Sequence, residues 1–298
     1  MLRWPKISIV TPSMNQGIFL ESTILSVLGQ GYPNLEYFII DGGSTDNSID
    51  VIKKYQDKLT FWCSEKDNGQ SQAINKGFSM ATGEILAWIN SDDILMPQSL
   101  FLMAHFYSSS EGRDTLFFGN CIHFEECPSG VISYGSDVAA NAEKYDLNIC
   151  DYIIQPSSFW SKTIWEQVGP LNESLHYAFD WEWFLKAKEK KINFKPLSTV
   201  LSLYRIHDSH KTATGGVKRM SEIEKIYNRF SKPEIAILYK SIISDLDTNL
   251  KRRIMERIKR RFVIKFSSQK DPISFLKKIN KKYNNYSDTL LEGIYNMR

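Results

Sequence analysis

Residues 85–93 read ILAWINSDD, a short apolar run that ends in two carboxylates. An apolar run of this length, bounded by polar residues, is typical of a strand that is buried on both faces. Asp92 and Asp93 would then stand directly after a buried strand, where one or two carboxylates can hold a hard divalent cation together with substrate phosphates. Turns favour Asp for other reasons as well, so the pair gains its weight from its neighbours in the fold.

The sequence on either side of this run alternates between strand and helix patterns. Strands are predicted at 7–10, 35–40, 60–63 and 116–124, and helices before Gly29, through Tyr55, over 70–80 and from Pro97 to about Tyr107. This alternation predicts βαβ units and an α/β fold with a mostly parallel sheet. Asp41 also follows a strand directly, and ligands of such sheets bind outside the carboxyl ends of the strands. We therefore expect both acidic loops on one rim of the sheet.

Length and composition restrict the class of protein. The chain has 298 residues, 42% of them hydrophobic and 24% charged, which excludes a disordered or collagen-like chain and allows one large or two medium domains. No apolar run approaches the roughly 18 residues of a membrane span, and we expect no signal peptide before the first strand. The four cysteines show no CxxC spacing, which disfavours a zinc site or a disulfide framework and favours a reducing cytoplasm.

Charge is distributed unevenly along the chain. Residues 1–217 carry a net charge of −8 and residues 218–298 a net charge of +11. From about residue 217 the pattern is purely helical, and Ile254, Ile258, Phe262 and Phe266 form an apolar stripe. Cations surround the stripe at Arg252, Arg253, Arg257, Lys259, Arg260, Arg261 and Lys265. The region predicts either a helix at an anionic membrane surface or a stripe that packs on the protein itself or on a second copy.

A pair of acids lies among aromatic residues at the start of a predicted helix. Asp180 and Glu182 are two positions apart in the run FDWEW at 179–183. An aromatic environment raises the pKa of a carboxyl group and suits a general base. Acids at a helix N-terminus also occur because of the helix dipole alone, so this run by itself leaves both interpretations open.

Three basic residues follow the predicted strand at 199–204. Arg205, His207 and Lys211 could together bind a diphosphate, although a lone histidine is more often a surface residue than a ligand. No GxGxxG follows the first strand and no GxxxxGK[ST] is present, which disfavours a dinucleotide cofactor site and a P-loop.

Taken together, these motifs resemble glycosyltransferase family 2, and the resemblance runs from about Ile7 to Lys211. The matching pieces are VTPSMNQG at 10–17, DGGSTD at 41–46, DNGQS at 67–71, AINKG at 73–77, SDD at 91–93, QPSSFW at 155–160, the acid at Asp180, and RIH at 205–207 with Lys211. One such piece is a weak signal, and this many in this order is a strong one.

The resemblance implies a binding site for a nucleotide. Its residues would be Thr11, Pro12, Asn15, Asp41, Asp67, Gly69, Asn75 and Asp92. Asp41 would accept a hydrogen bond from the uracil N–H, and Asp92 would face the ribose. Asp93 and His207 would hold Mg²⁺ or Mn²⁺. Ser91 occupies the first acidic place of the family's DxD motif, which leaves one carboxylate fewer for the metal.

The resemblance also assigns the chemistry. Asp180 matches the catalytic base, and Phe179 stands where the family often has Glu. Diphosphate or acceptor contacts would come from Gln155, Glu182, Arg205 and Lys211.

The family's fold implies a Rossmann-like sheet flanked by helices, of glycosyltransferase A type. We expect a catalytic domain at 1–216 and a basic helical region at 217–298. The implied function is inverting transfer of a sugar, from a UDP-hexose or UDP-N-acetylhexosamine, to a hydroxyl of a glycan or polyprenyl-diphosphate-linked acceptor in surface polysaccharide (O-antigen or capsule) synthesis.

The expected location is the cytoplasm, at the inner face of the membrane, with no nucleic-acid partner. The alternatives are a sugar-nucleotide nucleotidyltransferase, which would need a basic Gly-rich loop that residues 11–17 lack, and a non-catalytic nucleotide-sugar binder.

Overall fold

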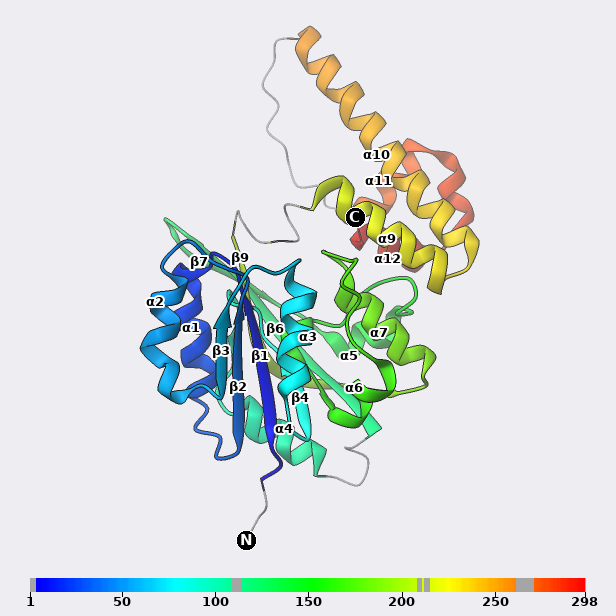
Figure 1. Cartoon of the computed structure of the whole chain (residues 1–298). Coiled ribbons are helices and arrows are strands. Elements are labelled where there is room, and N and C mark those ends of the chain that lie inside the picture. The colour runs from blue at the N-terminus through cyan, green and yellow to red at the C-terminus, as the bar shows by residue number, and fades with distance from the viewer. Residues whose placement is uncertain (1–3, 109–113, 208–210, 212–214, 261–270, 298) are drawn as a thin grey trace. The chain divides into compact units, whose positions relative to one another are not determined.

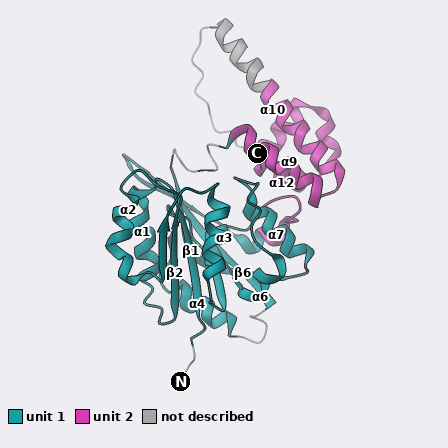
Figure 2. Ribbon diagram, in the orientation of Figure 1, with its two compact units in different colours: residues 1–140, 153–215 teal, residues 141–152, 216–298 magenta. Residues whose placement is uncertain are grey.

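The computed structural model describes residues 4–108, 114–207, 211, 215–260 and 271–297, without the side chains of 249–260. The chain forms two compact units (Figure 2). Unit 1 comprises Met1–Ala140 and Ile153–Gly215, and unit 2 comprises Asn141–Tyr152 and Gly216–Arg298. The sequence predicts a boundary near residue 216; unit 2 in addition takes in 141–152, which no sequence pattern indicated.

Unit 1 is built on a nine-stranded sheet (Figure 1). Its strands are β1 (Ile7–Ser13), β2 (Leu35–Asp41), β3 (Phe61–Ser64), β4 (Ile85–Trp88), β5 (Ile94–Leu95), β6 (Thr115–Cys127), β7 (Gly130–Gly135), β8 (Ser158–Ser161) and β9 (Asn193–Ile206). The order is β3-β2-β1-β4-β8-β6-β9-β5, with β7 on β6. Strands β1 to β4 pair in parallel as predicted, and so do β6 and β9, whereas β8, β7 and β5 pair antiparallel.

Helices cover both faces of the sheet. They are α1 (Gly17–Leu28), α2 (Ser48–Tyr55), α3 (Gln70–Met80), α4 (Ser99–Tyr107), α6 (Lys162–Val168) and α7 (Phe179–Glu189), with 3-10 turns η1 (Gln56–Lys58) and η3 (Gln155–Ser157); α5 (Val138–Lys144) crosses the unit boundary. Ile9 belongs to one core cluster with Ile24 of α1 and Met103 of α4. On the opposite face α3 approaches so closely that a Cβ on Gly77 would lie 2.5 Å from Cγ1 of Val10. Because successive side chains of a strand alternate, α3 lies across the sheet from α1 and α4.

One predicted helix start is wrong by two residues. Pro97 does not lie in the first turn of α4, which begins at Ser99. Gln98 has a φ of 66°, so the chain turns through the left-handed region before the helix begins. Proline fixes its own φ but cannot show that the next residue leaves the helical region.

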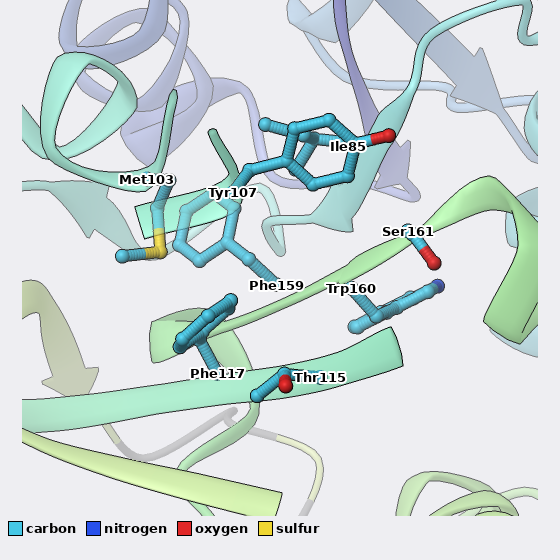
Figure 3. A pocket seen from close by; sticks show the side chains of 8 residues that line it. All are labelled: Ile85, Met103, Tyr107, Thr115, Phe117, Phe159, Trp160 and Ser161. Atoms are coloured by element: carbon cyan, nitrogen blue, oxygen red, sulfur yellow. The ribbon is translucent and has the colours of Figure 1, made fainter. Parts of the chain in front are cut away.

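A small apolar gap with no room for a water molecule lies between the sheet and α4 (Figure 3). Its lining residues are Ile85, Met103, Tyr107, Thr115, Phe117, Phe159, Trp160 and Ser161. Ile85 is the first residue of β4, whereas the acidic loop follows the last, so the gap lies at the opposite end of that strand.

Glu36 ties three segments of unit 1 together. Its carboxylate accepts from Ser8 Oγ at 2.6 Å, from Lys6 Nζ at 3.2 Å and from the Thr82 N–H at 2.8 Å. Burial alone would raise the pKa of Glu36, but the hydrogen bonds from Ser8, Thr82 and Lys6 outweigh it and lower the pKa to about 2. A carboxyl group whose pKa falls on folding stabilises the fold above its unfolded pKa, and this contribution is lost as pH falls through the folded value.

We expect Glu36→Gln to lower the free energy of unfolding at pH 7 by about 1–2 kcal/mol, a figure reduced for solvent screening of a partly exposed group. Urea unfolding of both proteins between pH 7 and pH 2 measures this. The difference should shrink below pH 4.5, the ordinary value for Glu, and a difference that is constant with pH would contradict the electrostatic explanation.

Unit 2 is helical, with α9 (Gly216–Phe230), α10 (Pro233–Arg260), α11 (Pro272–Ile279), η4 (Lys281–Asn285) and α12 (Asp288–Asn296). Its interior includes Ile223, Tyr227, Tyr239, Ile242 and Leu291. The predicted stripe at 254–266 and its flanking cations lie outside the residues whose side chains are described. None of the described helices combines the length and apolar composition needed to cross a bilayer.

Candidate active site

The acidic loop at 90–93 follows β4 at the carboxyl edge of the sheet. Asp93 is 1% exposed, and its carboxylate accepts from the Arg205 N–H at 3.2 Å and from Asn90 Nδ2 at 3.2 Å. Burial, and then the charge of Asp92, raise the pKa of Asp93 well above its ordinary value. Asp92 is more open, and its Oδ2 lies 3.1 Å from Nε2 of His207. The structure therefore places His207, predicted for the metal, against Asp92, predicted for the ribose, in the loop that carries Asp93.

These residues fit a divalent cation. Within the described ranges, no three His, Cys, Asp or Glu side chains are grouped so that they could hold a metal ion by themselves. Mg²⁺ and Mn²⁺ do not need one when a substrate supplies phosphate oxygens. A buried carboxylate with a raised pKa beside a second carboxylate is a place where positive charge is favourable. Asp93 and Asp92 therefore suit a cation whose other ligands are diphosphate oxygens.

Arg205 binds the acidic loop through hydrogen bonds to Asp92 and Asp93. Its guanidinium is sandwiched between the rings of Phe19 and Phe124, with 4.9 and 4.6 Å from Cζ to the ring centroids. Its Nε donates to the backbone oxygen of Asp92 at 3.2 Å and its Nη1 to Glu126 at 2.7 Å. The predicted contact with diphosphate remains a prediction, and these contacts favour a role in positioning the loop.

Replacing Arg205 with Lys is expected to lower turnover by about 10- to 100-fold, because a misplaced loop loses the productive geometry. The donor KM should change little, since the guanidinium contacts the loop. Steady-state kinetics of Arg205→Lys measures this, with Glu126→Gln as the control for loss of the exposed partner alone. A raised donor KM at unchanged turnover would instead assign Arg205 to the diphosphate.

Asp41 and Asp67 lie at the end of β2 and after β3. Asp41 is fully buried, and its carboxylate accepts from the N–H groups of Gly43 and Ser44 at 3.0 and 2.8 Å and from the hydroxyls of Ser44 and Ser64. Burial raises the pKa of Asp67, and the nearby charge of Asp41 adds to the rise. Both acids stand on the edge that carries the 90–93 loop, because β2 and β4 flank β1 in parallel. The predicted common rim is confirmed.

The other predicted nucleotide residues divide into two groups. Pro12 lies near the end of β1, at the same edge of the sheet. Asn15 has a φ of 52° and accepts a hydrogen bond from the Thr45 N–H, and Gly69 has a φ of 131° at the start of α3. These residues shape loops at the edge. Two others have internal partners. The Thr11 hydroxyl lies 3.0 Å from the buried Tyr37 hydroxyl, and Asn75 exchanges hydrogen bonds of 2.9 Å with the backbone of Leu171. Their side chains are used to hold the fold.

A chain of polar side chains crosses this edge, and sequence reasoning missed two of its members as site residues. Lys211 Nζ donates to Gln70 Oε1 at 3.0 Å, and Gln70 Nε2 donates to Asn90 Oδ1 at 2.6 Å. Asn90 Nδ2 reaches both Asp93 and, at 3.3 Å, Gln155 Oε1. The sequence signals were that Gln70 lies in the motif at 67–71 at a helix start and that Asn90 follows a strand.

The acid pair lies in the first turn of α7, as predicted. Asp180 is half-buried and accepts from the Trp181 N–H at 2.8 Å. Glu182 is 2% exposed and pairs with Lys186 at 3.0 Å. The ring of Phe179 lies 5.2 Å from Lys211 Nζ, which places the start of α7 at the polar chain described above. Asp180 is therefore the more accessible acid of the two.

The fold and the acidic edge define a glycosyltransferase of A type, and comparisons with known proteins agree. The model of the family Glycosyl transferase family 2 matches residues 8–120 of this chain. An uncharacterized glycosyltransferase of Rickettsia typhi is 25% identical over 239 residues, covering 76% of this chain and 72% of that protein. The putative teichuronic acid biosynthesis glycosyltransferase TuaG of Bacillus subtilis is 35% identical over 97 residues, 31% of this chain and 38% of that protein.

Solved structures share the fold. TarS 1-349 of S. aureus in complex with UDP-GlcNAc aligns with a TM-score of 0.59 at 16% identity, over 74% of this chain and 64% of that one. The mannosyltransferase PcManGT of Pyrobaculum calidifontis, in complex with GDP-Man and Mn²⁺, aligns with a TM-score of 0.60 at 13% identity, over 99% of this chain and 85% of that one. This chain thus spans just under two thirds of the TarS chain.

Proposed function

We propose that this chain transfers a sugar, with inversion, from a UDP-hexose or UDP-N-acetylhexosamine to a hydroxyl group of a glycan or lipid-linked acceptor in surface-polysaccharide synthesis. The observation that carries the proposal is the gathering of Asp41, Asp67, Asp92 and Asp93 on one edge, with His207 on Asp92. The UDP-GlcNAc complex of TarS and the name of TuaG support the nucleotide and the polymer class.

The chemistry follows from the positions of the side chains. The Asp41 loop and Asp67 would bind the nucleoside, and His207 and Lys211 would lie over the diphosphate. Asp180 would take the proton from the acceptor hydroxyl, which then attacks the anomeric carbon from the face opposite the leaving group, through an oxocarbenium-like state. Asp92, Asp93 and His207 would hold Mg²⁺ or Mn²⁺, which neutralises charge on the leaving diphosphate. An α-linked donor would give a β-linked product.

Release of UDP from a panel of nucleotide sugars, with and without Mg²⁺ or Mn²⁺, tests the proposal. The expected result is metal-dependent release with one donor, faster when acceptor is added. Release of pyrophosphate from a nucleoside triphosphate and a sugar phosphate would show a nucleotidyltransferase. Binding of donors without any release would show a non-catalytic binder.

We also propose that residues 1–216 carry the catalysis and that the basic region at 217–298 contacts an anionic membrane or a second copy of the chain at the cytoplasmic face of the inner membrane. The support is the net charge of +11 over residues 218–298. Several cations near an anionic surface, each contributing about 1 kcal/mol, suffice for reversible binding. Co-sedimentation with anionic but not with neutral liposomes would favour the membrane. Binding to neither kind of liposome would favour the second copy of the chain.

A further inference from the structure

Three aromatic rings from three neighbouring strands form one surface, which we call the aromatic platform: His123 of β6, Tyr134 of β7 and Tyr204 of β9. In the sheet register His123 stands opposite both tyrosines. Its ring stacks on Tyr134 with centroids 4.8 Å apart, and Tyr204 meets it edge-on at 5.3 Å. Tyr134 is 59% exposed, so the platform has an open side.

The platform adjoins the acidic loop. Tyr204 immediately precedes Arg205, whose backbone N–H binds the carboxylate of Asp93. Side chains two apart on a strand share a face, so Tyr204 lies on the face of Ser202. The Ser202 hydroxyl lies 2.6 Å from that of Ser157, which belongs to the same short turn η3 as Gln155 of the polar chain. Tyr204 therefore lies on the face of the sheet that carries η3, one residue from the N–H that binds Asp93.

The chemistry of the platform fits a neutral, hydroxyl-bearing ring. Burial lowers the pKa of His123, so the imidazole is uncharged at neutral pH. Its Nδ1 is buried and has no hydrogen-bond partner among the described residues, and such atoms are few in folded proteins and need an explanation such as a bound water or ligand. The exposed carboxylate of Glu125 on the same hairpin repels an anionic lipid surface.

We propose that the aromatic platform binds a sugar ring of the acceptor glycan, beside the residue that receives the transferred sugar. The apolar face of a pyranose lies flat on an aromatic ring while its hydroxyls stay hydrogen-bonded at the rim, and tyrosine provides both an apolar body and a polar tip. This inference rests on the proposed function for the nature of its ligand. It assigns the acceptor subsite to β6, β7 and β9.

The β6–β7 hairpin provides a matched control. Val131 is 65% exposed, close to the 59% of Tyr134, but it stands opposite Glu126, an odd number of positions from Tyr134 along the strand. Its side chain therefore points to the other face of the sheet. Tyr134→Ala removes the open ring of the platform, Tyr134→Trp keeps an aromatic face, and Val131→Ala removes a similar exposed apolar group elsewhere.

The full-length chain and its three variants are applied, with UDP present, to an array of bacterial surface oligosaccharides. We expect the wild type to bind at least one oligosaccharide, Tyr134→Ala to bind it about tenfold more weakly, and Tyr134→Trp and Val131→Ala to keep the affinity within about twofold. Circular dichroism confirms that the variants fold. Absence of wild-type binding, or equal binding by Tyr134→Ala, would overturn the proposal.

Two parallel measurements separate this proposal from the wider function. Binding of the protein to phosphatidylglycerol vesicles tests for a lipid ligand. If the wild type binds these vesicles and Tyr134→Ala and Val131→Ala lose that binding equally, the hairpin binds lipid and the platform is overturned as a glycan site. Release of UDP from nucleotide sugars, with and without the bound oligosaccharide as acceptor, tests donor turnover. Glycan binding that depends on Tyr134 in a protein that releases no UDP would leave the platform standing and reject the proposed transferase.

Discussion

Replacing Asp93 with Asn is expected to lower turnover by about 10³-fold, the largest loss that we predict. The carboxylate is buried, and its pKa is raised by that burial and by Asp92, so the site is short of positive charge. Asn keeps the volume and can still accept from the Arg205 N–H, but it removes the charge that would hold a cation against the diphosphate. Loss of several kcal/mol of charge stabilisation corresponds to a factor of this size.

A chelator should reproduce the effect of this substitution. Excess EDTA is expected to reduce the wild-type rate by a similar factor, Mn²⁺ should restore it, and Asp93→Asn should respond to neither. Asp50→Asn, at an exposed carboxylate in the first turn of α2, is the matched control and should keep the wild-type rate. Full activity in EDTA, or an active Asp93→Asn protein, would show that no cation acts through Asp93.

Asp180→Asn is expected to lower turnover by about 10²-fold or more while the affinity for UDP stays near that of the wild type. The side chain would act only when the acceptor hydroxyl loses its proton, so its loss should not change binding of the donor nucleotide. Steady-state rates beside calorimetric titration with UDP separate the two effects.

Glu182→Gln is the comparison for this variant, because it removes the neighbouring acid. Glu182 is buried and paired with Lys186, so the substitution should lower the melting temperature and change the rate of the folded protein by less than about tenfold. The reverse result, an active Asp180→Asn beside an inactive Glu182→Gln, would exchange the two roles. Activity in both would place the base elsewhere.

The parallel half of the sheet and its acidic rim could be predicted because their signals are local. An apolar strand followed by a carboxylate occurs at Asp41 and again at Asp92, and parallel strands place such ends on one edge. The antiparallel insertion of β8 between β4 and β6 could not be predicted in this way, since it depends on pairing between segments that are distant in the sequence.

The hydrogen bonds that individual side chains make within the fold could not be predicted from a sequence motif either. Asn75 and Thr11 stand in motifs of the nucleotide site, yet the structure uses them to hold a loop and a buried tyrosine. Gln70 and Asn90, by contrast, connect Lys211 to Asp93 through amide groups whose partners come from four separate segments. A motif records which residue types occur, and their hydrogen-bond partners are decided only when distant segments meet.

The hydrogen bond from the Arg205 N–H to Asp93 spans 112 residues of sequence, and it determines when during synthesis the site can form. The segment that the family model matches ends at residue 120, before β8, α7 and β9 have left the ribosome. Contacts so distant in sequence close late, because the entropy of closing a long loop must be overcome first. A nascent chain that ends before β9 therefore carries the acidic loop without the strand that fixes it, and it should be inert until residue 207 emerges.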